Sequence, residues 1–283
     1  MNTQQRGMTL VEILVGLAIG LVVAAIALTS LQVSQFISTT INEATMLQQD
    51  AGTAMRIIGL QIRQAGSTAL NLESSFGDAT ETAALHPVLF EPVLVNGEHL
   101  PSDSNRVVAI AAPSVAKSTG PSLQTRYENF AEWLFQGTAA TQWDSLLRDC
   151  LAQSKSNRSL SPIISSTFFL RDGQLMCTGV AGTPQPVISN VKDFTVRLLT
   201  QMSAHTSELE ASYRYAVPSE MGDASLPWDR VRAVEICLEL ESPNIKVPDV
   251  GATYLKCNGQ QQAKRDRLVV VAKQLFHIRA AVD

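Results

Sequence analysis

The sequence predicts an α+β fold, in which one long N-terminal helix packs on an antiparallel β-sheet whose strands are joined by long loops. Residues 8–31 form an apolar run of membrane length, and a helical stripe of apolar residues follows from Leu47 to Ala65. Short alternating segments separated by turn residues make up the rest of the chain. These observations predict a helix over residues 8–66 and a globular, β-rich domain over residues 67–283.

The composition is that of a protein with one sizeable globular part. The chain has 283 residues, a formal net charge of −4 and 45% hydrophobic residues. Lys and Arg are widely spaced and form no basic run, so we expect no nucleic-acid partner.

The apolar run near the N-terminus has the length of a membrane span. From Met8 to about Leu31 the only charged residue is Glu12. About 20 apolar residues are enough to cross a hydrocarbon core of about 30 Å. A secretory signal has a shorter apolar core, of about 7–15 residues, and a small-residue cleavage site. The run is too long for that signal, and an uncleaved signal anchor remains an alternative.

The residues at the start of this run resemble a known processing signal. The stretch Arg6-Gly7-Met8-Thr9-Leu10-Val11-Glu12 is similar to the class III prepilin signal of type IV pilins and type II secretion pseudopilins. In that family a dedicated peptidase cuts after the glycine, and the new N-terminal residue is N-methylated. The resemblance implies a cleaved leader over residues 1–7, with Gly7 before the cut and Met8 as the methylated N-terminus. Met8 replaces the more common Phe, and Thr29 stands where many major pilins have a proline.

Glu12 then becomes the fifth residue of the mature chain, and the resemblance implies a role for it in assembly. A carboxylate at the centre of a bilayer costs roughly 2–3 kcal/mol or more unless a cation pairs with it. In a filament of staggered parallel helices, Glu12 can reach the α-amino group of a neighbouring subunit. The alternative is that Glu12 lies at headgroup depth in the first helical turn, where a helix N-terminus favours an acid.

The same run contains small residues at four-residue spacing, Gly16, Gly20 and Ala24. This spacing permits close approach of membrane helices, so these residues are candidates for helix packing. Glycine and alanine are also common in membrane helices without such a role.

The helical pattern continues beyond the membrane-length run. An apolar stripe recurs at steps of three and four residues, and a polar face opposes it. The stripe is Leu47, Ala51, Ala54, Ile58, Ile62 and Ala65, and the polar face includes Gln48, Gln49, Asp50, Arg56, Gln61, Arg63 and Gln64. With no proline before Gly66, we expect a continuous helix on which a sheet packs.

The rest of the chain shows a pattern of strands with one helical segment. Asp172-Gly173 is a strong two-residue hairpin signal, and residues 126–151 are expected to form one or two short helices. Glu239 and Glu241 alternate with apolar residues and are expected on a solvated face. The predicted strands are Pro87–Val95, Arg106–Ala111, Ile163–Arg171, Gln174–Cys177, Val187–Thr200, Ala211–Val217, Arg230–Glu241 and Leu268–Val282.

Four cysteines, all in the second part of the chain, allow three pairings. We favour Cys150–Cys177 and Cys237–Cys257, because each pair closes a short loop. Zinc is the alternative, but the spacings fit no common zinc site, so no metal is expected. Reduced thiols would suit a cytosolic chain better than an exported one.

No catalytic motif of a hydrolase, metalloprotease, P-loop enzyme or dinucleotide-binding enzyme occurs in the sequence, and the four histidines are isolated. We therefore expect a structural protein without a cofactor rather than an enzyme.

Three segments of the β-rich domain resemble PilW-type minor pilins: Ile188–Leu199, Trp228–Leu238 and the closing strand around His277. The resemblance implies a protein of the inner membrane, with a periplasmic domain, that helps to start type IV pilus assembly and ends near the pilus tip. The implied partners are other minor pilins, the major pilin, the prepilin peptidase, the inner-membrane assembly platform and a tip adhesin. A J-type pseudopilin of type II secretion is the nearest alternative, and an adhesin or DNA-uptake module is a further one.

Overall fold

The structure is a computed structural model in which the chain separates into two compact units, Met1–Met46 and Leu47–Asp283. The described residues are 9–67, 70–71, 89–90, 94–95, 98–99, 108–111, 120–129, 132–136, 140–144, 146–153, 163–202, 212–221, 230–246 and 251–278.

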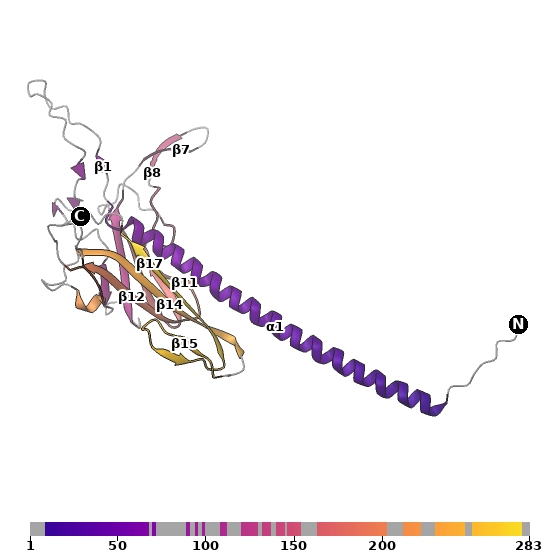
Figure 1. Ribbon diagram of the computed structural model, residues 1–283. Helices are drawn as coiled ribbons and strands as arrows, with labels where there is room; N and C mark the ends of the chain where they lie inside the picture. The colour runs from indigo at the N-terminus through magenta and orange to yellow at the C-terminus, as the bar shows by residue number, and fades with distance from the viewer. Residues whose placement is uncertain are drawn as a thin grey trace, which may run out of the picture. The chain divides into compact units, whose positions relative to one another are not determined.

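The long helix predicted from the sequence is α1, Leu10–Gln64, with 55 residues (Figure 1). Gly66 follows its end with a φ of 77°, a conformation that glycine adopts without the steric penalty of a Cβ. The N–H of Gly66 donates to the carbonyl of Arg126 at 2.8 Å, so the chain leaves the helix attached to the first long strand.

The second half of α1 belongs to the larger unit and provides one wall of its core. The whole predicted stripe, Leu47, Ala51, Ala54, Ile58, Ile62 and Ala65, is buried. The prediction for Gln61 is wrong, because this residue is only 5% exposed rather than part of the polar face. Its burial depends on polar partners from distant segments, which are described below.

A five-stranded antiparallel sheet forms one part of the larger unit. The strands β9, Ile163–Arg171, and β10, Gln174–Thr178, are joined by Asp172 and Gly173, both with positive φ, as the hairpin signal predicts. In spatial order the sheet is β11 (Pro184–Ile188), β10, β9, β6 (Pro121–Glu128) and β5 (Val108–Ala111).

A four-stranded antiparallel sheet lies next to it in the core. Its strands are, in spatial order, β13 (Tyr213–Ala216), β12 (Val191–Gln201), β14 (Val231–Lys246) and β17 (Arg267–His277). A short 3-10 helix, Pro218–Glu220, follows β13. One face of β14, with Val234, Ile236, Leu238 and Leu240, joins α1 in the hydrophobic core.

Four two-stranded antiparallel pairs complete the described strands. They are β1 (Leu70–Asn71) with β2 (Leu89–Phe90), β3 (Leu94–Val95) with β4 (Glu98–His99), β7 (Glu132–Gln136) with β8 (Ala140–Asp144), and β15 (Thr253–Leu255) with β16 (Gln261–Ala263). The fold is therefore α+β, as predicted, with one long helix packed against antiparallel sheets.

Three predictions of local structure are wrong. Residues 126–151 include no helix among their described positions but contain the end of β6 and the β7–β8 pair, in which Trp133 and Trp143 are Cα partners in the register. The single strand over Val187–Thr200 is two strands in different sheets, because the chain turns at Asn190 with a φ of 62°. The strands β1, β4, β6, β15 and β16 lie where no strand was predicted.

α1 approaches the four-stranded sheet closely at Gly59. A Cβ at this position would collide with the ring of Phe276 on β17. Gly59 and Phe276 are both buried. The absence of a side chain at Gly59 therefore sets how near the helix and the strand can lie.

Candidate functional site

The first half of α1 is an exposed apolar surface. Every residue from Thr9 to Thr39 is exposed, including a series of large aliphatic side chains from Leu10 to Leu31. Among the described residues, α1 is the one helix long and apolar enough to cross a membrane. Residues 10–31 span about 33 Å at 1.5 Å per residue, which is close to the thickness of a hydrocarbon core. Such a surface requires lipid or other apolar helices around it.

The polar groups within this apolar segment are few, and one of them is bonded to its own helix. The Thr29 hydroxyl donates to the carbonyl of Ile26 at 2.9 Å. Thr39, Thr40 and Thr45 bond in the same way to carbonyls three or four residues earlier. Hydroxyls satisfied by their own helix do not carry an unpaired donor into hydrocarbon.

Glu12 lies in the first turn of α1, and its N–H donates to the Thr9 carbonyl at 3.1 Å. Gly16, Gly20 and Ala24 follow it at four-residue steps, so these four residues are neighbours along one side of the helix. All four are exposed, and no atom of the described part of the chain lies within 4 Å of a Cβ placed at Gly16 or Gly20. The helix thus presents an acid followed by a row of small residues. Gly7 and Met8, the predicted cleavage and methylation positions, lie outside the described residues.

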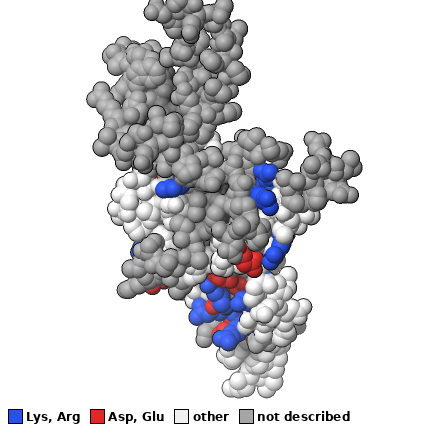
Figure 2. Space-filling model, turned by 90° about the vertical axis from the view of Figure 1, so that its left-hand side faces the viewer, with Lys and Arg blue, Asp and Glu red and all other residues white. Residues whose placement is uncertain are grey.

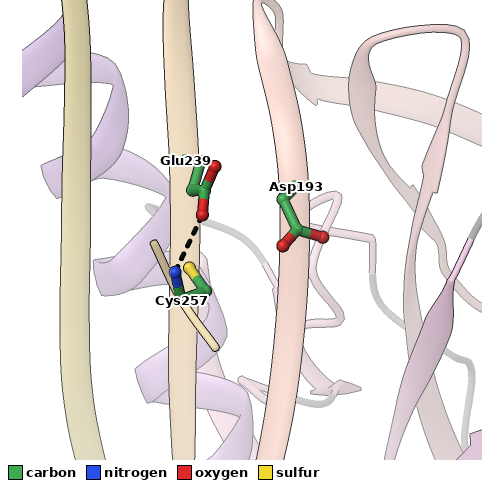
Figure 3. Close-up of side chains that lie close together, drawn as sticks. All are labelled: Asp193, Glu239 and Cys257. Carbon is green, nitrogen blue, oxygen red and sulfur yellow. Dashed lines mark hydrogen bonds between the residues drawn. The ribbon is translucent and has the colours of Figure 1, made fainter. Parts of the chain in front are cut away.

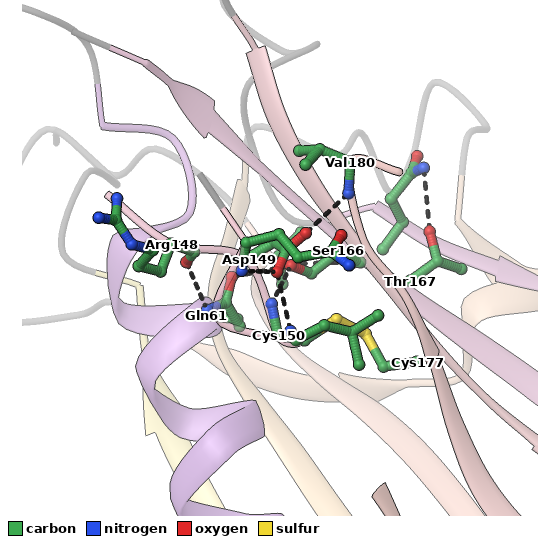
Figure 4. The surroundings of a disulfide bond; sticks show 12 residues. Gln61, Arg148, Asp149, Cys150, Ser166, Thr167, Cys177 and Val180 are labelled. Atoms are coloured by element: carbon green, nitrogen blue, oxygen red, sulfur yellow. Dashed lines mark hydrogen bonds between the residues drawn. A yellow bond between two sulfur atoms is a disulfide. The ribbon is translucent and has the colours of Figure 1, made fainter. Parts of the chain in front are cut away.

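At the other end of α1, a buried polar network joins the helix to the larger unit (Figure 4). The Gln61 amide donates to the Arg148 carbonyl at 3.1 Å, and its oxygen accepts from the Ser166 hydroxyl at 2.9 Å. Tyr127, which is fully buried, also donates its hydroxyl to the Arg148 carbonyl. Burial, and secondarily the Asp149 carboxylate, raises the pKa of Tyr127 far above its usual value.

Asp149 organises the loop that follows this contact. Its Oδ1 accepts the N–H groups of Leu151 and Gln153, each at 2.8 Å, and its Oδ2 accepts the N–H of Val180 at 2.7 Å. A side chain at Gly179 would occupy the space of that carboxylate. Asp149 is only 3% exposed, and these three donors satisfy its charge inside the protein.

The structure contains both disulfides that the cysteine spacing favoured. Cys150 is bonded to Cys177, with Cα atoms 6.5 Å apart, beside the Gln61 network. Cys237 is bonded to Cys257, with Cα atoms 5.6 Å apart. The first disulfide joins the 146–153 loop to β10, and the second joins the β15–β16 connection to the outer face of β14.

Under that connection lies Glu239, and the prediction that it is solvated is wrong (Figure 3). Glu239 is fully buried, and its Oε1 accepts the N–H of Cys257 at 2.8 Å. Its Oε2 has no hydrogen-bond partner among the residues that the structure describes. Glu241, two residues later, is partly exposed and pairs with Lys192 on β12 and with Arg267 on β17.

Asp193, Glu239 and Cys257 bring three potential ligand atoms within 4.8 Å of one another. The Cys257 sulfur is already bonded to Cys237. One oxygen of Glu239 accepts the Cys257 N–H, and one of Asp193 accepts the Thr195 hydroxyl at 3.4 Å. Among the described residues, this group therefore offers a metal ion two carboxylates and no thiolate.

Sequence reasoning missed both Gln61 and Glu239 as buried polar groups. Gln61 directly precedes Ile62 of the buried stripe, and Glu239 lies on a strand that also carries Cys237 two residues earlier. Cys237 was the available signal for the burial of Glu239. A disulfide on this face of β14 implies that another segment covers the strand there and buries the residues beside the cysteine.

Comparison with known proteins identifies the N-terminal segment. Residues 2–28 match the family model described as the prokaryotic N-terminal methylation motif. The chain carries this motif. The match includes Gly7, Met8 and Glu12, together with the row Gly16, Gly20 and Ala24.

Neither the curated proteins nor the solved structures assign a function to the chain. The curated proteins contain no match to the sequence. Among solved structures, the type IV-like pilin TTHA1219 from Thermus thermophilus is similar, with a TM-score of 0.39 and 11% identity. The similarity covers 83% of this chain and 98% of that chain. At this TM-score the likeness assigns no function.

Proposed function

We propose that this chain is a minor pilin, a structural subunit that helps to start type IV pilus assembly and is incorporated in or near the pilus tip. The methylation motif over residues 2–28, placed on an exposed apolar helix, carries the proposal. Such a helix serves first as a membrane anchor and then as part of a fibre core, because both environments cover its apolar surface. This role requires no catalysis.

In this proposal a prepilin peptidase removes residues 1–7 by cutting after Gly7 and methylates the new amino group of Met8. Residues 8–31 hold the chain in the inner membrane before assembly, and residues 67–283 lie in the periplasm. The two disulfides suit an oxidising compartment of this kind.

Glu12 would pair with the α-amino group of a neighbouring subunit. The next charged residue along α1 is Glu43, so Glu12 has no cation within the apolar half of its own helix. An acid inside the membrane requires a partner, and cleavage after Gly7 creates an amine at the edge of the same segment. Gly16, Gly20 and Ala24 would let a neighbouring helix approach on the same side.

The place at the tip rests on the PilW-type resemblance and on the size of the larger unit. A domain this large with long connections is harder to repeat along a tightly packed filament than to accommodate at its end. The other minor pilins, the major pilin and the assembly platform are the partners that this place implies.

N-terminal mass analysis of the mature protein tests the processing step. We expect a chain that begins with N-methylated Met8. The Gly7→Ala variant should retain its leader, while Gly16→Ala, the same change outside the cleavage site, should be processed normally. A mature wild-type chain that begins at Met1 would contradict the proposal.

Co-purification with other pilins tests the role of Glu12. The Glu12→Gln variant should insert into the membrane at the wild-type level but lose most of its incorporation into pili. Glu43→Gln, the same change at the next acid of α1, should keep incorporation. Wild-type incorporation of Glu12→Gln would show that the carboxylate has no assembly role.

Deletion of the gene distinguishes the pilus from type II secretion. Loss of surface pili with normal protein secretion supports the minor pilin. Loss of secretion with normal piliation would place the chain among the pseudopilins instead.

A further inference from the structure

A small basic pocket lies between the β15–β16 pair and the ends of three sheet strands. Its volume is about 160 Å³. Tyr254, Lys256 and Arg265 line it from the β15–β16 side. From the sheet, it is lined by Lys192 of β12, Glu241 of β14 and Arg267 of β17. Figure 2 shows Lys and Arg side chains gathered beside acidic ones on one face of the molecule.

The charges that line this pocket do not balance. Four cationic side chains face one carboxylate, that of Glu241. Lys192 forms an ion pair with Glu241, and Arg267 Nε lies 3.6 Å from the same carboxylate. Arg267 is further held by hydrogen bonds to the carbonyls of Ser242 and Pro243, at 2.9 and 2.7 Å. Glu241 is therefore already engaged by two cations on the sheet side.

Lys256 and Arg265 are the remaining cations. Across the described residues, neither side chain forms a hydrogen bond or ion pair. Asp193 and Glu239 lie on the same sheet but do not line the pocket. An entering anion thus meets two uncompensated cations and one carboxylate that is already paired.

The Tyr254 hydroxyl is a second, independent observation. Its oxygen is buried beside Lys192 and, among the described residues, forms no hydrogen bond of ordinary geometry, and Tyr254 lines the pocket. Buried hydroxyls are nearly always hydrogen-bonded, because an unpaired one costs about 1–3 kcal/mol. An acceptor in the pocket would satisfy this donor.

We propose that this pocket binds a tetrahedral oxyanion, phosphate or sulfate, either free or as the terminal group of a monoester. Lys256 and Arg265 supply charge-assisted hydrogen bonds, and the Tyr254 hydroxyl supplies a neutral one. These three donors lie on the β15–β16 side of the pocket. They outnumber the two oxygens of a planar carboxylate and suit the four oxygens of a tetrahedral group better. The volume lies below the range of about 300–1,000 Å³ typical for sites of larger organic ligands, so the pocket admits the anionic group alone. This proposal does not depend on the assembly role of the N-terminal helix.

Calorimetric titration of the full detergent-solubilised chain with inorganic phosphate and with sulfate tests the site. Chloride keeps the ionic strength constant, because salt screens such contacts. We expect saturable binding with one site. Lys256→Gln and Arg265→Gln should each weaken it about tenfold, and Tyr254→Phe should weaken it severalfold. The matched control is Lys264→Gln, which removes the same charge from a neighbouring position that does not line the pocket, and it should bind phosphate as the wild type does.

Three results would overturn the proposal. The first two are the absence of saturable binding and an equal loss in Lys264→Gln, either of which would show only diffuse attraction of anions. The third is acetate binding as tightly as phosphate, which would exclude a site built for a tetrahedral group. The denaturation midpoint of each variant shows that it is folded.

A phosphate monoester, glycerol 3-phosphate, then identifies the source of the anion. Binding as tight as that of free phosphate supports a site for the end of a larger molecule. Binding of free phosphate with exclusion of the monoester supports a site for the free ion.

Discussion

The hydroxyl of Ser166 on β9 donates to Gln61 Oε1 on α1 at 2.9 Å and accepts the backbone N–H of Cys150 at 3.0 Å. Through this one hydroxyl, the end of the long helix, a central strand and the first disulfide are connected. Gln61 reaches a third segment with its amide, which donates to the Arg148 carbonyl. Movement of α1 relative to the five-stranded sheet would break these buried hydrogen bonds together.

Gln61→Ala should therefore destabilise the larger unit. The change leaves the Ser166 hydroxyl without its acceptor in a dry environment, so we expect a loss of about 1–3 kcal/mol in the free energy of unfolding. Denaturant unfolding measures it. Gln49→Ala on the exposed side of the same helix is the matched control and should change the stability by less than about 0.5 kcal/mol. Equal losses in the two variants would contradict the role of the network.

The two glycines of the second half of α1 should respond oppositely to alanine. Gly59→Ala would place a methyl group against the Phe276 ring, and we expect a loss of about 1–3 kcal/mol. Gly52→Ala meets nothing within 4 Å and should stabilise the helix by up to about 1 kcal/mol. Thermal unfolding of both variants checks the prediction, which fails if Gly59→Ala is as stable as Gly52→Ala.

The stability of the larger unit should fall in alkali, partly because of Tyr127. Burial raises the pKa of Tyr127 above its ordinary value of 10.0. Below pH 10 both the folded and the unfolded chain hold the phenol proton, so the stability is fully present. As the pH rises above 10, the unfolded chain releases the proton and the folded chain keeps it, which favours unfolding.

The hydrogen bond to Glu241 also raises the pKa of Lys192 above its ordinary value of 10.5. The free energy of unfolding should therefore fall further as the pH rises above 10.5, because the unfolded chain then releases the Lys192 proton more readily than the folded chain does. Unfolding free energies measured between pH 9 and 11.5 should therefore fall less steeply in Tyr127→Phe than in the wild type. Lys192→Gln should retain the larger part of the decrease in unfolding free energy with pH. An unchanged slope in Tyr127→Phe would show that this phenol does not contribute.

Glu239 offers a test of a buried charge. Glu239→Gln keeps an acceptor for the Cys257 N–H and removes the charge beside Asp193, so we expect a gain of about 1 kcal/mol. Glu239→Ala leaves that N–H unpaired and should cost about 1–3 kcal/mol. Chemical denaturation and hydrogen exchange at the Cys257 amide distinguish the two. A Gln variant less stable than the Ala variant would show that the negative charge itself is required.

Removal of the second disulfide should release the β15–β16 pair. The Cys237→Ser, Cys257→Ser double variant loses the covalent bond between this pair and β14, and we expect tryptic cleavage after Lys256, Lys264 or Arg265. The Cys150→Ser, Cys177→Ser variant should lose a similar free energy of unfolding, about 3–4 kcal/mol, but keep these sites protected. Equal tryptic cleavage in both variants would contradict a local role for the second disulfide.

Some features of this protein could be predicted from sequence because neighbouring residues determine them. The apolar run over 8–31, the stripe from Leu47 to Ala65 and the Asp172-Gly173 turn each depend on periodicity or backbone preference within a few residues. The methylation motif is equally local, since it lies within the consecutive residues 2–28. These local signals were enough to predict the fold class and to identify residues 8–31 as a candidate membrane anchor.

Other features depend on residues far apart in the chain. Gln61 is buried because the Arg148 carbonyl and the Ser166 hydroxyl, 87 and 105 residues away, satisfy its amide. Glu239 is buried because the β15–β16 connection covers it and donates an N–H. A polar residue in a periodic pattern looks solvated until its partners are known.

The sequence by itself determined a long helix, apolar in its first half and amphipathic in its second, that carries the methylation motif, because hydrophobic periodicity and the motif both lie in consecutive residues. Only the tertiary structure decided where the chain changes sheets at Asn190, which polar groups are buried, and which cations meet around Tyr254. The physical reason is that burial and charge balance are properties of the packed surroundings, which segments distant in sequence create together.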